Sequence, residues 1–121
     1  MFEISVEDTF AAGHALRGYR GKCEKVHGHN YKVQLAVEGG KLASAGLLMD
    51  FVELKRLLHV VIDRLDHEFL NDVAPFDAVN PTAENMAKYF HDEIARGLPP
   101  EVRLASVKIW ETDTSTATYR P

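Results

Sequence analysis

The residues in this chain most capable of chemistry are histidines. His27 and His29 stand two positions apart in the segment 26–30. If that segment is extended, both rings point to the same side, because side chains alternate along a strand. Zinc in a catalytic site takes three protein ligands at about 2.0–2.1 Å for nitrogen and keeps one position open. We expect His14, just past the first predicted strand, to be the third ligand.

Three neutral imidazoles would leave a zinc ion its full positive charge, which suits polarising an oxygen or acidifying a bound water. A His-Gly-His motif can also be a plain surface loop, so the pair alone does not establish a metal site. The third histidine, and a cysteine four residues before His27, favour the metal. His59 and His91 fall within predicted helices, on solvated or partly buried faces, and we assign them no role.

Cys23 is the single cysteine of the chain and has two possible roles. A lone buried cysteine usually behaves as a small hydrophobic residue, but Cys23 lies in a Gly-rich loop beside Lys22 and Lys25. Nearby positive charge favours the thiolate, which can act as a nucleophile or a general base. The alternative is that Cys23 is a fourth zinc ligand, which would make the site structural.

Two further groups could bind or move protons. Asp66 and His67 are adjacent at the predicted end of the first helix and could form a polarised proton-transfer pair. A histidine at that position is also favoured by the helix dipole alone. Glu111 follows Val107 and Ile109 on one face of a predicted strand. An inward carboxylate needs a partner, such as a ligand with a guanidinium-like edge.

The elements that must position these groups follow from hydrophobic periodicity. Apolar and polar residues alternate over 2–10 and 30–38, which predicts two half-buried strands. A long Gly-rich, basic loop over 13–28 separates them, and loops of that length are usually functional or disordered. Residues 102–111 and 116–120 predict a third and a fourth strand.

Two amphipathic helices are predicted between the second and third strands. Asp50 opens the first, with Glu53 in capping-box spacing, and Pro81 stands in the first turn of the second. The first apolar stripe is Leu54, Leu58, Val61 and Leu65. The second stripe is Ala83, Met86 or Ala87, Phe90 and Ile94, and the helix stops before Gly97.

The element order strand, strand, helix, helix, strand, strand predicts an α+β fold. We expect a four-stranded antiparallel sheet with both helices on one face. The length of 121 residues fits a single domain over residues 1–121. A sheet this small has edges that need a partner or a blunting device, which predicts a homo-oligomer.

Composition excludes several classes of protein. Fourteen basic against 18 acidic residues give a net charge of −4, which argues against nucleic-acid binding. One cysteine cannot form an intrachain disulfide. The uncharged run 42–49 is far shorter than the roughly 20 residues that span a bilayer. Residues 1–12 lack the basic cluster of a signal peptide, and we expect a cytoplasmic location.

Five segments taken together resemble the 6-pyruvoyltetrahydropterin synthase family. They are Phe-Ala-Ala-Gly-His at 10–14, Cys-x3-His-Gly-His-Asn-Tyr at 23–31, Leu-Asp-His at 65–67, Asn-Pro-Thr-Ala-Glu-Asn at 80–85 and Glu-Thr at 111–112. The resemblance covers nearly the whole chain in the expected order. The three-residue gap after the cysteine resembles the bacterial branch of the family, the 6-carboxytetrahydropterin synthases of the queuosine (7-deazaguanine) pathway.

The resemblance implies a T-fold, in which sheets with a helix pair assemble around a symmetry axis into barrels. It implies a homo-oligomer, a hexamer or tetramer, with active sites between subunits. The implied substrate is 7,8-dihydroneopterin triphosphate. The implied products are 6-carboxy-5,6,7,8-tetrahydropterin, acetaldehyde and triphosphate. Arg17, Arg20, Lys22 and Lys25 could bind the triphosphate, although a solvated loop face explains them equally well.

The resemblance also implies roles for individual residues. The zinc ligands would be His14, His27 and His29. Cys23 would be the proton acceptor, and Asp66 with His67 a proton relay. Glu111 would anchor the amino-pyrimidine edge of the pterin and join the relay, and Thr82 and Glu24 would also contact the substrate.

One departure from the bacterial pattern leaves alternatives open. Glu24 stands next to Cys23, and a related branch that uses Glu in this loop resembles an aldolase. That activity would cleave the substrate to 6-hydroxymethyl-7,8-dihydropterin for folate synthesis. A 6-pyruvoyltetrahydropterin synthase-like activity is a further alternative within the family. A non-catalytic, zinc-stabilised interaction module is the alternative from another class.

Overall fold

Two long antiparallel strands form the base of the molecule. The computed structural model describes residues 1–18 and 25–121. β1 (Phe2–His14) and β2 (His27–Gly39) pair along their whole length, from Phe2 opposite Gly39 to His14 opposite His27. Both strands extend further toward the histidines than the alternating pattern predicted. The loop expected at 13–28 is therefore shorter, because its first and last residues belong to the sheet.

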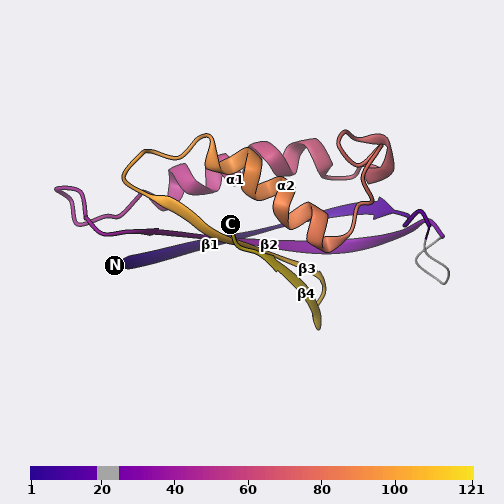
Figure 1. The fold of residues 1–121 in the computed structure, drawn as a ribbon, viewed down its shortest axis with the longest axis horizontal. Coiled ribbons are helices and arrows are strands. Elements are labelled where there is room, and N and C mark those ends of the chain that lie inside the picture. The colour runs from indigo at the N-terminus through magenta and orange to yellow at the C-terminus, as the bar shows by residue number, and fades with distance from the viewer. Residues whose placement is uncertain (19–24) are drawn as a thin grey trace.

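The predicted four-stranded antiparallel sheet is confirmed. β3 (Arg103–Thr112) pairs with β2, and β4 (Ser115–Tyr119) pairs with β3, so the strand order is β1-β2-β3-β4. The sheet twists along its length, and β3 and β4 diverge from the long β1–β2 pair (Figure 1). Strands that follow one another in the sequence are neighbours in the sheet, so no connection crosses another.

Both predicted helices are present, with caps that differ in detail from the prediction. α1 (Phe51–Leu65) begins after Asp50, whose side chain accepts a hydrogen bond from the Val52 N–H. The expected capping box does not form, because Glu53 instead pairs with Arg56 on the helix surface. No helix in the described part of the chain is long and apolar enough to cross a membrane.

The second helix, α2 (Ala83–Ala95), begins at the segment that carried the family resemblance. Thr82 is its N-cap, and the threonine side chain accepts from the Asn85 N–H at 3.1 Å. Pro81 therefore lies one residue before the cap, rather than in the first turn as predicted. A short 3-10 helix, η2 (Leu70–Asp72), lies between α1 and α2.

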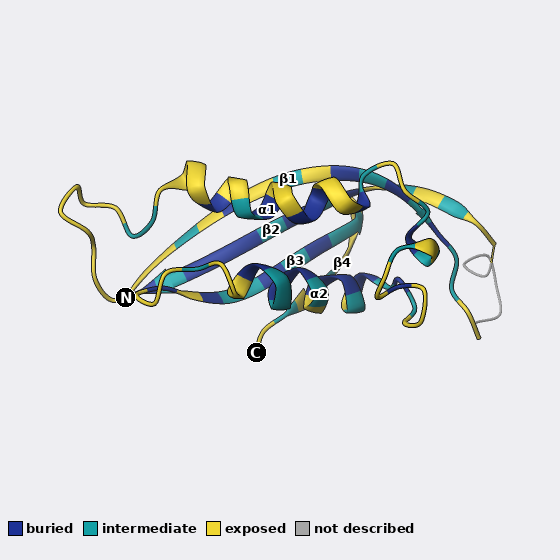
Figure 2. Cartoon of the chain, turned by 90° about the horizontal axis from the view of Figure 1, so that it is seen from above, coloured by how far each residue is buried: buried dark blue, intermediate teal, exposed yellow. Residues whose placement is uncertain are grey.

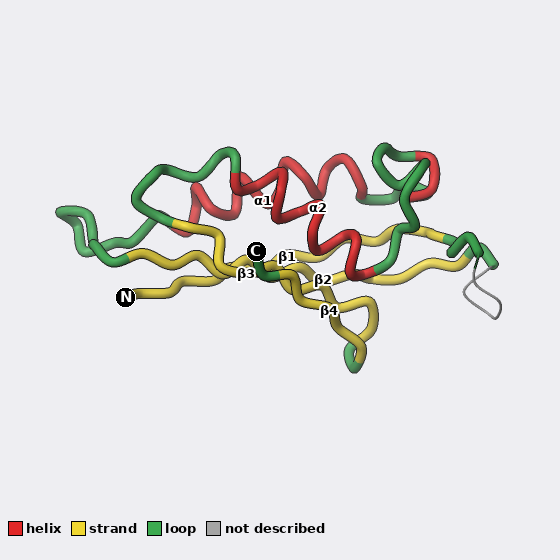
Figure 3. Tube along the Cα trace, viewed as in Figure 1, coloured by secondary structure: helices red, strands yellow, loops and turns green. Residues whose placement is uncertain are grey.

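Both helices cover one face of the sheet, which gives two layers (Figures 1 and 3). The inward stripe of β2 is fully buried, at Tyr31, Val33, Leu35 and Val37. The predicted helix stripes are buried as well, and Figure 2 shows buried residues along β2 and β3 in the region between α1 and α2. Burying a side chain of this size contributes roughly 1.5–3 kcal/mol, so this interface is the main source of stability.

The free edge of β1 is covered at the end where the histidines lie. The His67 N–H donates to the Ala11 carbonyl at 2.6 Å, and the Gly13 N–H donates to the Glu68 carbonyl at 3.0 Å. Phe69 forms a parallel bridge with Gly13. This short pairing blunts the sheet edge. It also places the Asp66–His67 pair beside the end of β1.

Candidate metal centre and active site

Three histidines meet at the adjoining ends of β1 and β2. His14 is the last residue of β1 and lies directly opposite His27, the first residue of β2. His29 follows two residues later on the same face. One ring nitrogen from each histidine lies within 4.8 Å of the others. His14 is only 1% exposed, and the other two are partly exposed. The structure therefore brings together the three residues that the spacing predicted as metal ligands.

Backbone carbonyls determine which nitrogens are free to bind a metal ion. His14 Nδ1 lies 2.8 Å from the Pro81 carbonyl oxygen, and His27 Nδ1 lies 2.7 Å from the Lys25 carbonyl oxygen. A carbonyl can only accept, so both Nδ1 atoms carry the proton in neutral rings. The two Nε2 atoms are then unprotonated, yet they lie 3.0 Å apart. Facing lone pairs repel, and a cation held between them removes that repulsion, so the donor set fits a metal ion.

His29 supplies a second sign that the cluster fits a cation. Its Nε2 atom is buried and makes no hydrogen bond among the described residues, although the Glu111 Oε1 atom lies 3.4 Å away. Burial lowers the pKa of His29, Glu111 opposes that shift, and His14 and His27 reinforce it. The neutral imidazole is the form that binds metals. An unsatisfied buried nitrogen is rare in proteins, and a bound ion would satisfy this one.

Tyr31 is a member of the site that the sequence analysis placed only in the core. Its hydroxyl oxygen lies 3.1 Å from His14 Nδ1, so the ring N–H lies near two acceptors, the hydroxyl and the Pro81 carbonyl. Burial, followed by the nearby Glu111, raises the pKa of Tyr31. Tyr31 therefore stays neutral and helps to fix the orientation of the His14 ring.

Glu111 lies between the histidine cluster and a cavity. Its Oε1 atom is 3.4 Å from His29 Nε2, and its side chain is 26% exposed. The cavity has a volume of about 380 Å³ and lies between the start of α2 and the β3–β4 hairpin. Its lining residues are Ala83, Glu84, Glu111, Ser115, Thr116, Ala117 and Thr118. A carboxylate at this boundary can bind a ligand that reaches from the cavity toward the metal site. Thr82 does not line this cavity, and its hydroxyl caps α2.

The Asp66–His67 pair forms as predicted, at the end of α1. Asp66 Oδ1 accepts the Ala11 N–H at 3.0 Å and lies 3.0 Å from His67 Nδ1. The Ala11 N–H is the main cause that lowers the pKa of Asp66, and His67 adds to it. A carboxylate in this position can orient the neighbouring imidazole through its Nδ1 atom.

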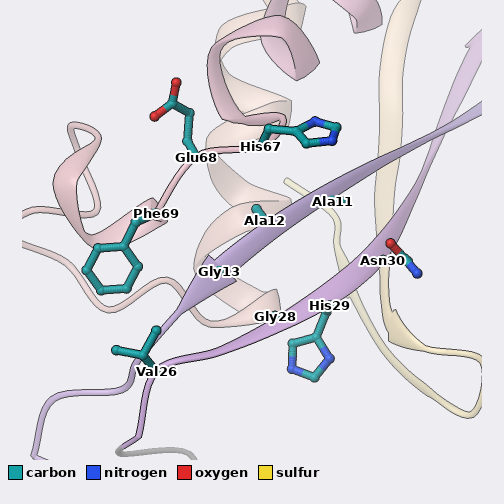
Figure 4. Close-up of a pocket in the computed structure, with 10 residues that line it drawn as sticks. All are labelled: Ala11, Ala12, Gly13, Val26, Gly28, His29, Asn30, His67, Glu68 and Phe69. Carbon is teal, nitrogen blue, oxygen red and sulfur yellow. The ribbon is translucent and has the colours of Figure 1, made fainter.

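His67 itself has an unusual backbone conformation and a largely exposed side chain. Its φ angle is 61°, in the left-handed region that costs a non-glycine residue about 1–2 kcal/mol. The side chain is 82% exposed. It lines a cavity of about 530 Å³ that His29 also borders, together with Val26 and Phe69 (Figure 4). Backbone strain of this kind concentrates at functional sites.

Several residues singled out in the sequence have other placements. Cys23, Glu24, Arg20 and Lys22 lie outside the described residues. Arg17 donates from its guanidinium to the carbonyls of Phe76 and Asn71, at 2.9 and 3.3 Å, so its charge is used within the fold. Lys25 is exposed. Arg17 and Lys25 are the two residues of this basic group that the structure describes. Of these two, only Lys25 has a side chain that makes no such hydrogen bond within the described residues.

The two histidines without an assigned role differ from each other. His59 is exposed on α1 and lies 3.4 Å from Asp8 and 3.2 Å from Asp63. His91 is more deeply buried than its sequence position suggested, and its Nε2 donates to the Leu104 carbonyl at 3.1 Å. Neither approaches the cluster of His14, His27 and His29.

The fold and the histidine cluster together define the class of protein. The structure superimposes on that of 6-pyruvoyl tetrahydropterin synthase from Caenorhabditis elegans with a TM-score of 0.90. The two chains are 29% identical, and the match covers 99% of this chain and 95% of the other. The architecture is therefore the T-fold. The family model for 6-pyruvoyl tetrahydropterin synthase matches residues 3–121, and the chain is an enzyme of that family.

Relatives with different named activities have similar identities. The 6-carboxy-5,6,7,8-tetrahydropterin synthase of Haemophilus influenzae is 30% identical over 99% of both chains. The dihydroneopterin monophosphate aldolase of Pyrococcus furiosus is 35% identical over 85% of this chain and 83% of its own. Overall identity therefore assigns the family and leaves the product to be argued from the site.

Proposed function

We propose that this enzyme converts 7,8-dihydroneopterin triphosphate, with uptake of water, into 6-carboxy-5,6,7,8-tetrahydropterin, acetaldehyde and triphosphate, as a step of queuosine biosynthesis. The observation that carries the proposal is the cluster of His14, His27 and His29 beside Glu111. Similarity to the Haemophilus influenzae enzyme along the full length and the three-residue gap between Cys23 and His27 support the choice of product.

The histidine cluster would hold zinc through the two unprotonated Nε2 atoms and a ring nitrogen of His29. When bound there, zinc would supply a positive charge that makes the hydroxyl-bearing side chain of the substrate more acidic. The chain itself fixes the ligand geometry, because the carbonyls of Pro81 and Lys25 hold the His14 and His27 rings. Oriented neutral imidazoles are what such a site requires.

Substrate binding is proposed for the cavity beside Glu111. Its volume of about 380 Å³ is in the range of small-molecule sites. The Glu111 carboxylate can accept two hydrogen bonds from an amino-pyrimidine edge, in the manner of a carboxylate–guanidinium pair. Thr82 and Glu24 remain proposed as further substrate contacts, and the observed helix-capping bond of Thr82 would have to coexist with such a role.

Proton transfer is assigned to Cys23, Asp66 and His67. We propose Cys23 as the proton acceptor, in the loop that joins the His14 and His27 ends of the two strands. The ionised Asp66 holds the His67 ring ready to receive or return a proton. Glu111 would complete the relay.

A homo-oligomer, a hexamer or tetramer built from single-domain subunits of residues 1–121, is proposed as the active form. β4 lies at one edge of the sheet and carries no further strand within the described residues. The His67 side chain is 82% exposed although its backbone is tightly held. A neighbouring subunit would cover both features and place the active site between subunits.

The second candidate function is aldolase-type cleavage to 6-hydroxymethyl-7,8-dihydropterin. It is favoured by Glu24, adjacent to Cys23, and by the similarity to the Pyrococcus furiosus aldolase. A 6-pyruvoyltetrahydropterin synthase-like product is the remaining alternative within the family. A purely structural zinc site, with Cys23 as the fourth ligand, is the alternative outside catalysis.

Product analysis decides between these functions. The wild type, Cys23→Ala and Glu24→Ala are each incubated with 7,8-dihydroneopterin triphosphate, and the pterins are identified by mass spectrometry. We expect the 6-carboxy product from the wild type and from Glu24→Ala, and none from Cys23→Ala, which should retain its zinc. A hydroxymethyl product that disappears in Glu24→Ala would establish the aldolase instead. Loss of zinc and of folding in Cys23→Ala, with no turnover by the wild type, would establish the structural site.

A further inference from the structure

We propose that Asn71 and Asn80 are positioning residues that hold the exit of β1 so that the His14 ring is oriented to bind a metal ion. The inference rests on the metal site of the proposed function. Neither asparagine touches the histidine cluster, and both act through the backbone that follows His14. Residue type and spacing give no sign of this role for Asn71, and Asn80 stands in the segment 80–85 that carries the family resemblance.

Both the oxygen and the nitrogen of the Asn71 side-chain amide form hydrogen bonds with the backbone of Ala15, the residue directly after His14. Its Oδ1 accepts the Ala15 N–H at 2.9 Å, and its Nδ2 donates to the Ala15 carbonyl at 2.8 Å. This pair of bonds imitates the pairing of a neighbouring strand at a point where β1 has left the sheet. The peptide that joins His14 to Ala15 is therefore held although no strand pairs with it.

Asn80 repeats the same arrangement two residues further along. Its Oδ1 accepts the Arg17 N–H at 2.9 Å, and its Nδ2 donates to the Arg17 carbonyl at 2.8 Å. We call each pair of hydrogen bonds, that of Asn71 with Ala15 and that of Asn80 with Arg17, a clamp. The two clamps are linked, because the Arg17 guanidinium donates to the Asn71 carbonyl at 3.3 Å. Residues 15–17 are thus held by two side chains from segments more than 50 positions away in the sequence.

The same short segment holds both the backbone beyond His14 and the His14 ring. Pro81, which follows Asn80, provides the carbonyl that accepts from His14 Nδ1 at 2.8 Å. The Asn80 carbonyl in turn accepts from the Thr82 N–H and from Asn85 Nδ2, at 2.8 and 2.9 Å. The beginning of α2 is therefore a rigid base that fixes His14 relative to the partner ligands. His27, by contrast, has its Nδ1 held by a carbonyl only two residues away.

This arrangement predicts an effect on metal affinity that is separate from stability. Residues that orient metal ligands from outside the coordination shell typically change affinity by about 10–100-fold when they are mutated. If the clamps orient His14, their loss should weaken metal binding by about that factor. If they only stabilise the fold, metal affinity should follow the melting temperature of each variant.

The test measures Co²⁺ binding to the full chain, by chelator competition and by the ligand-field absorption spectrum. The clamp variants are Asn71→Ala and Asn80→Ala, with Asn71→Asp and Asn80→Asp as same-shape variants that keep the Oδ1 acceptor and lose the donor. Val102→Ala, in the core and away from the cluster, is the control for lost stability. Gln34→Glu, on an exposed contact with Glu7, is the control for added negative charge.

We expect both alanine variants to bind Co²⁺ about tenfold more weakly or worse and to change its spectrum, while the controls stay within about twofold. The aspartate variants should fall between, and they decide the matter if an alanine variant does not fold. Clamp variants that bind Co²⁺ as tightly as Val102→Ala at equal melting temperature would overturn the proposal. The measurement uses no pterin, so a wild type that binds Co²⁺ but yields no 6-carboxy product would overturn the proposed function alone.

Discussion

The histidine cluster and the Asp66–His67 pair lie at the same end of the sheet, yet they are built in opposite ways. In the cluster, His14 is buried and the rings of His14 and His27 are held by carbonyls. His67 has a fixed, strained backbone and a side chain that is 82% exposed. All three rings of the cluster come from one chain, whereas Asp66 is the only group within the described residues that pairs with the His67 ring. The cluster is therefore the self-contained half of the proposed site, and His67 belongs to the half that the proposed neighbouring subunit would complete.

The largest effect should come from removing a ligand of the self-contained half. For His27→Ala we expect metal affinity to fall by about 10²–10³-fold or more, one ligand's share of the roughly 10–16 kcal/mol of a structural zinc site. Turnover should be lost with it. Without metal, the His27→Ala variant should not be destabilised by the loss of the His14–His27 contact. The two Nε2 atoms that face each other at 3.0 Å in the wild type no longer repel in the variant. Chelator competition and the melting temperature after metal removal measure the two effects, and retained metal with full turnover would contradict the assignment.

A change at His67 should separate activity from both metal binding and stability. For His67→Asn we expect kcat to fall by about 10²–10³-fold, as for a lost general acid–base group, while metal affinity is unchanged. Asparagine tolerates the left-handed conformation, so the fold should keep its stability. His67→Gly should be as stable or up to about 1 kcal/mol more stable than the wild type, because strain is relieved.

The control at this position is His67→Ala, which keeps the backbone strain of φ 61° and loses the imidazole. It should be less stable than His67→Gly. Equal stability of the alanine and glycine variants would show that the backbone relaxes, and unchanged kcat in His67→Asn would remove His67 from the proton relay.

A smaller effect is expected at Glu111, which lies beside the cluster and faces the cavity. For Glu111→Gln we expect pterin affinity to fall by about 10–100-fold, because a hydrogen bond to a charged group contributes about 1.5–3 kcal/mol. Metal affinity should change little. Titration of pterin fluorescence and chelator competition give the two values. A variant that loses metal while retaining pterin affinity would place Glu111 in the metal site instead.

The smallest effect concerns the pH dependence of stability. The folded-state pKa of Asp66 is lowered, first by the Ala11 N–H and then by His67. The ionised form therefore adds stability above the ordinary aspartate pKa of about 3.9, and this contribution is lost as the pH falls through the lower, folded-state value. In Asp66→Asn, which keeps an acceptor for the Ala11 N–H, the melting temperature should decline less steeply below about pH 4. If the melting temperatures of the variant and the wild type declined equally steeply below about pH 4, the lowered pKa of Asp66 would not be the source of this pH dependence.

Local patterns were sufficient to predict the elements of the fold. The period-two alternation of Val33, Leu35 and Val37 and the helical stripe from Leu54 to Leu65 are buried as expected. They succeed because each element buries one face, and the spacing of apolar residues records which face that is. The strand ends were less predictable, because β1 and β2 continue through Gly13 and Gly28. Glycine has no side chain, so it adds nothing to the alternation of apolar and polar residues that predicts a strand.

The site was only partly predictable for the same reason. His14, His27 and His29 are brought together by the pairing of neighbouring strands, which the sequence order already favours. The contacts of Asn71 and of the Pro81 carbonyl join residues 56 and 67 positions apart. Such contacts depend on how η2 and α2 pack against the sheet, and backbone acceptors leave no trace in residue type. The burial of His91 likewise depends on the position of β3.

The placement of His14 directly opposite His27 has a consequence for how the hairpin folds. Successive residues of a strand face opposite sides of the sheet, so sliding β1 by one residue against β2 would send the two rings to different faces. Every apolar residue of β1 would change sides in the same slip. A metal ion bound by both rings would therefore favour the observed register over a slip of one residue. Metal binding would thus stabilise the observed strand register as well as supply the positive charge used in the chemistry.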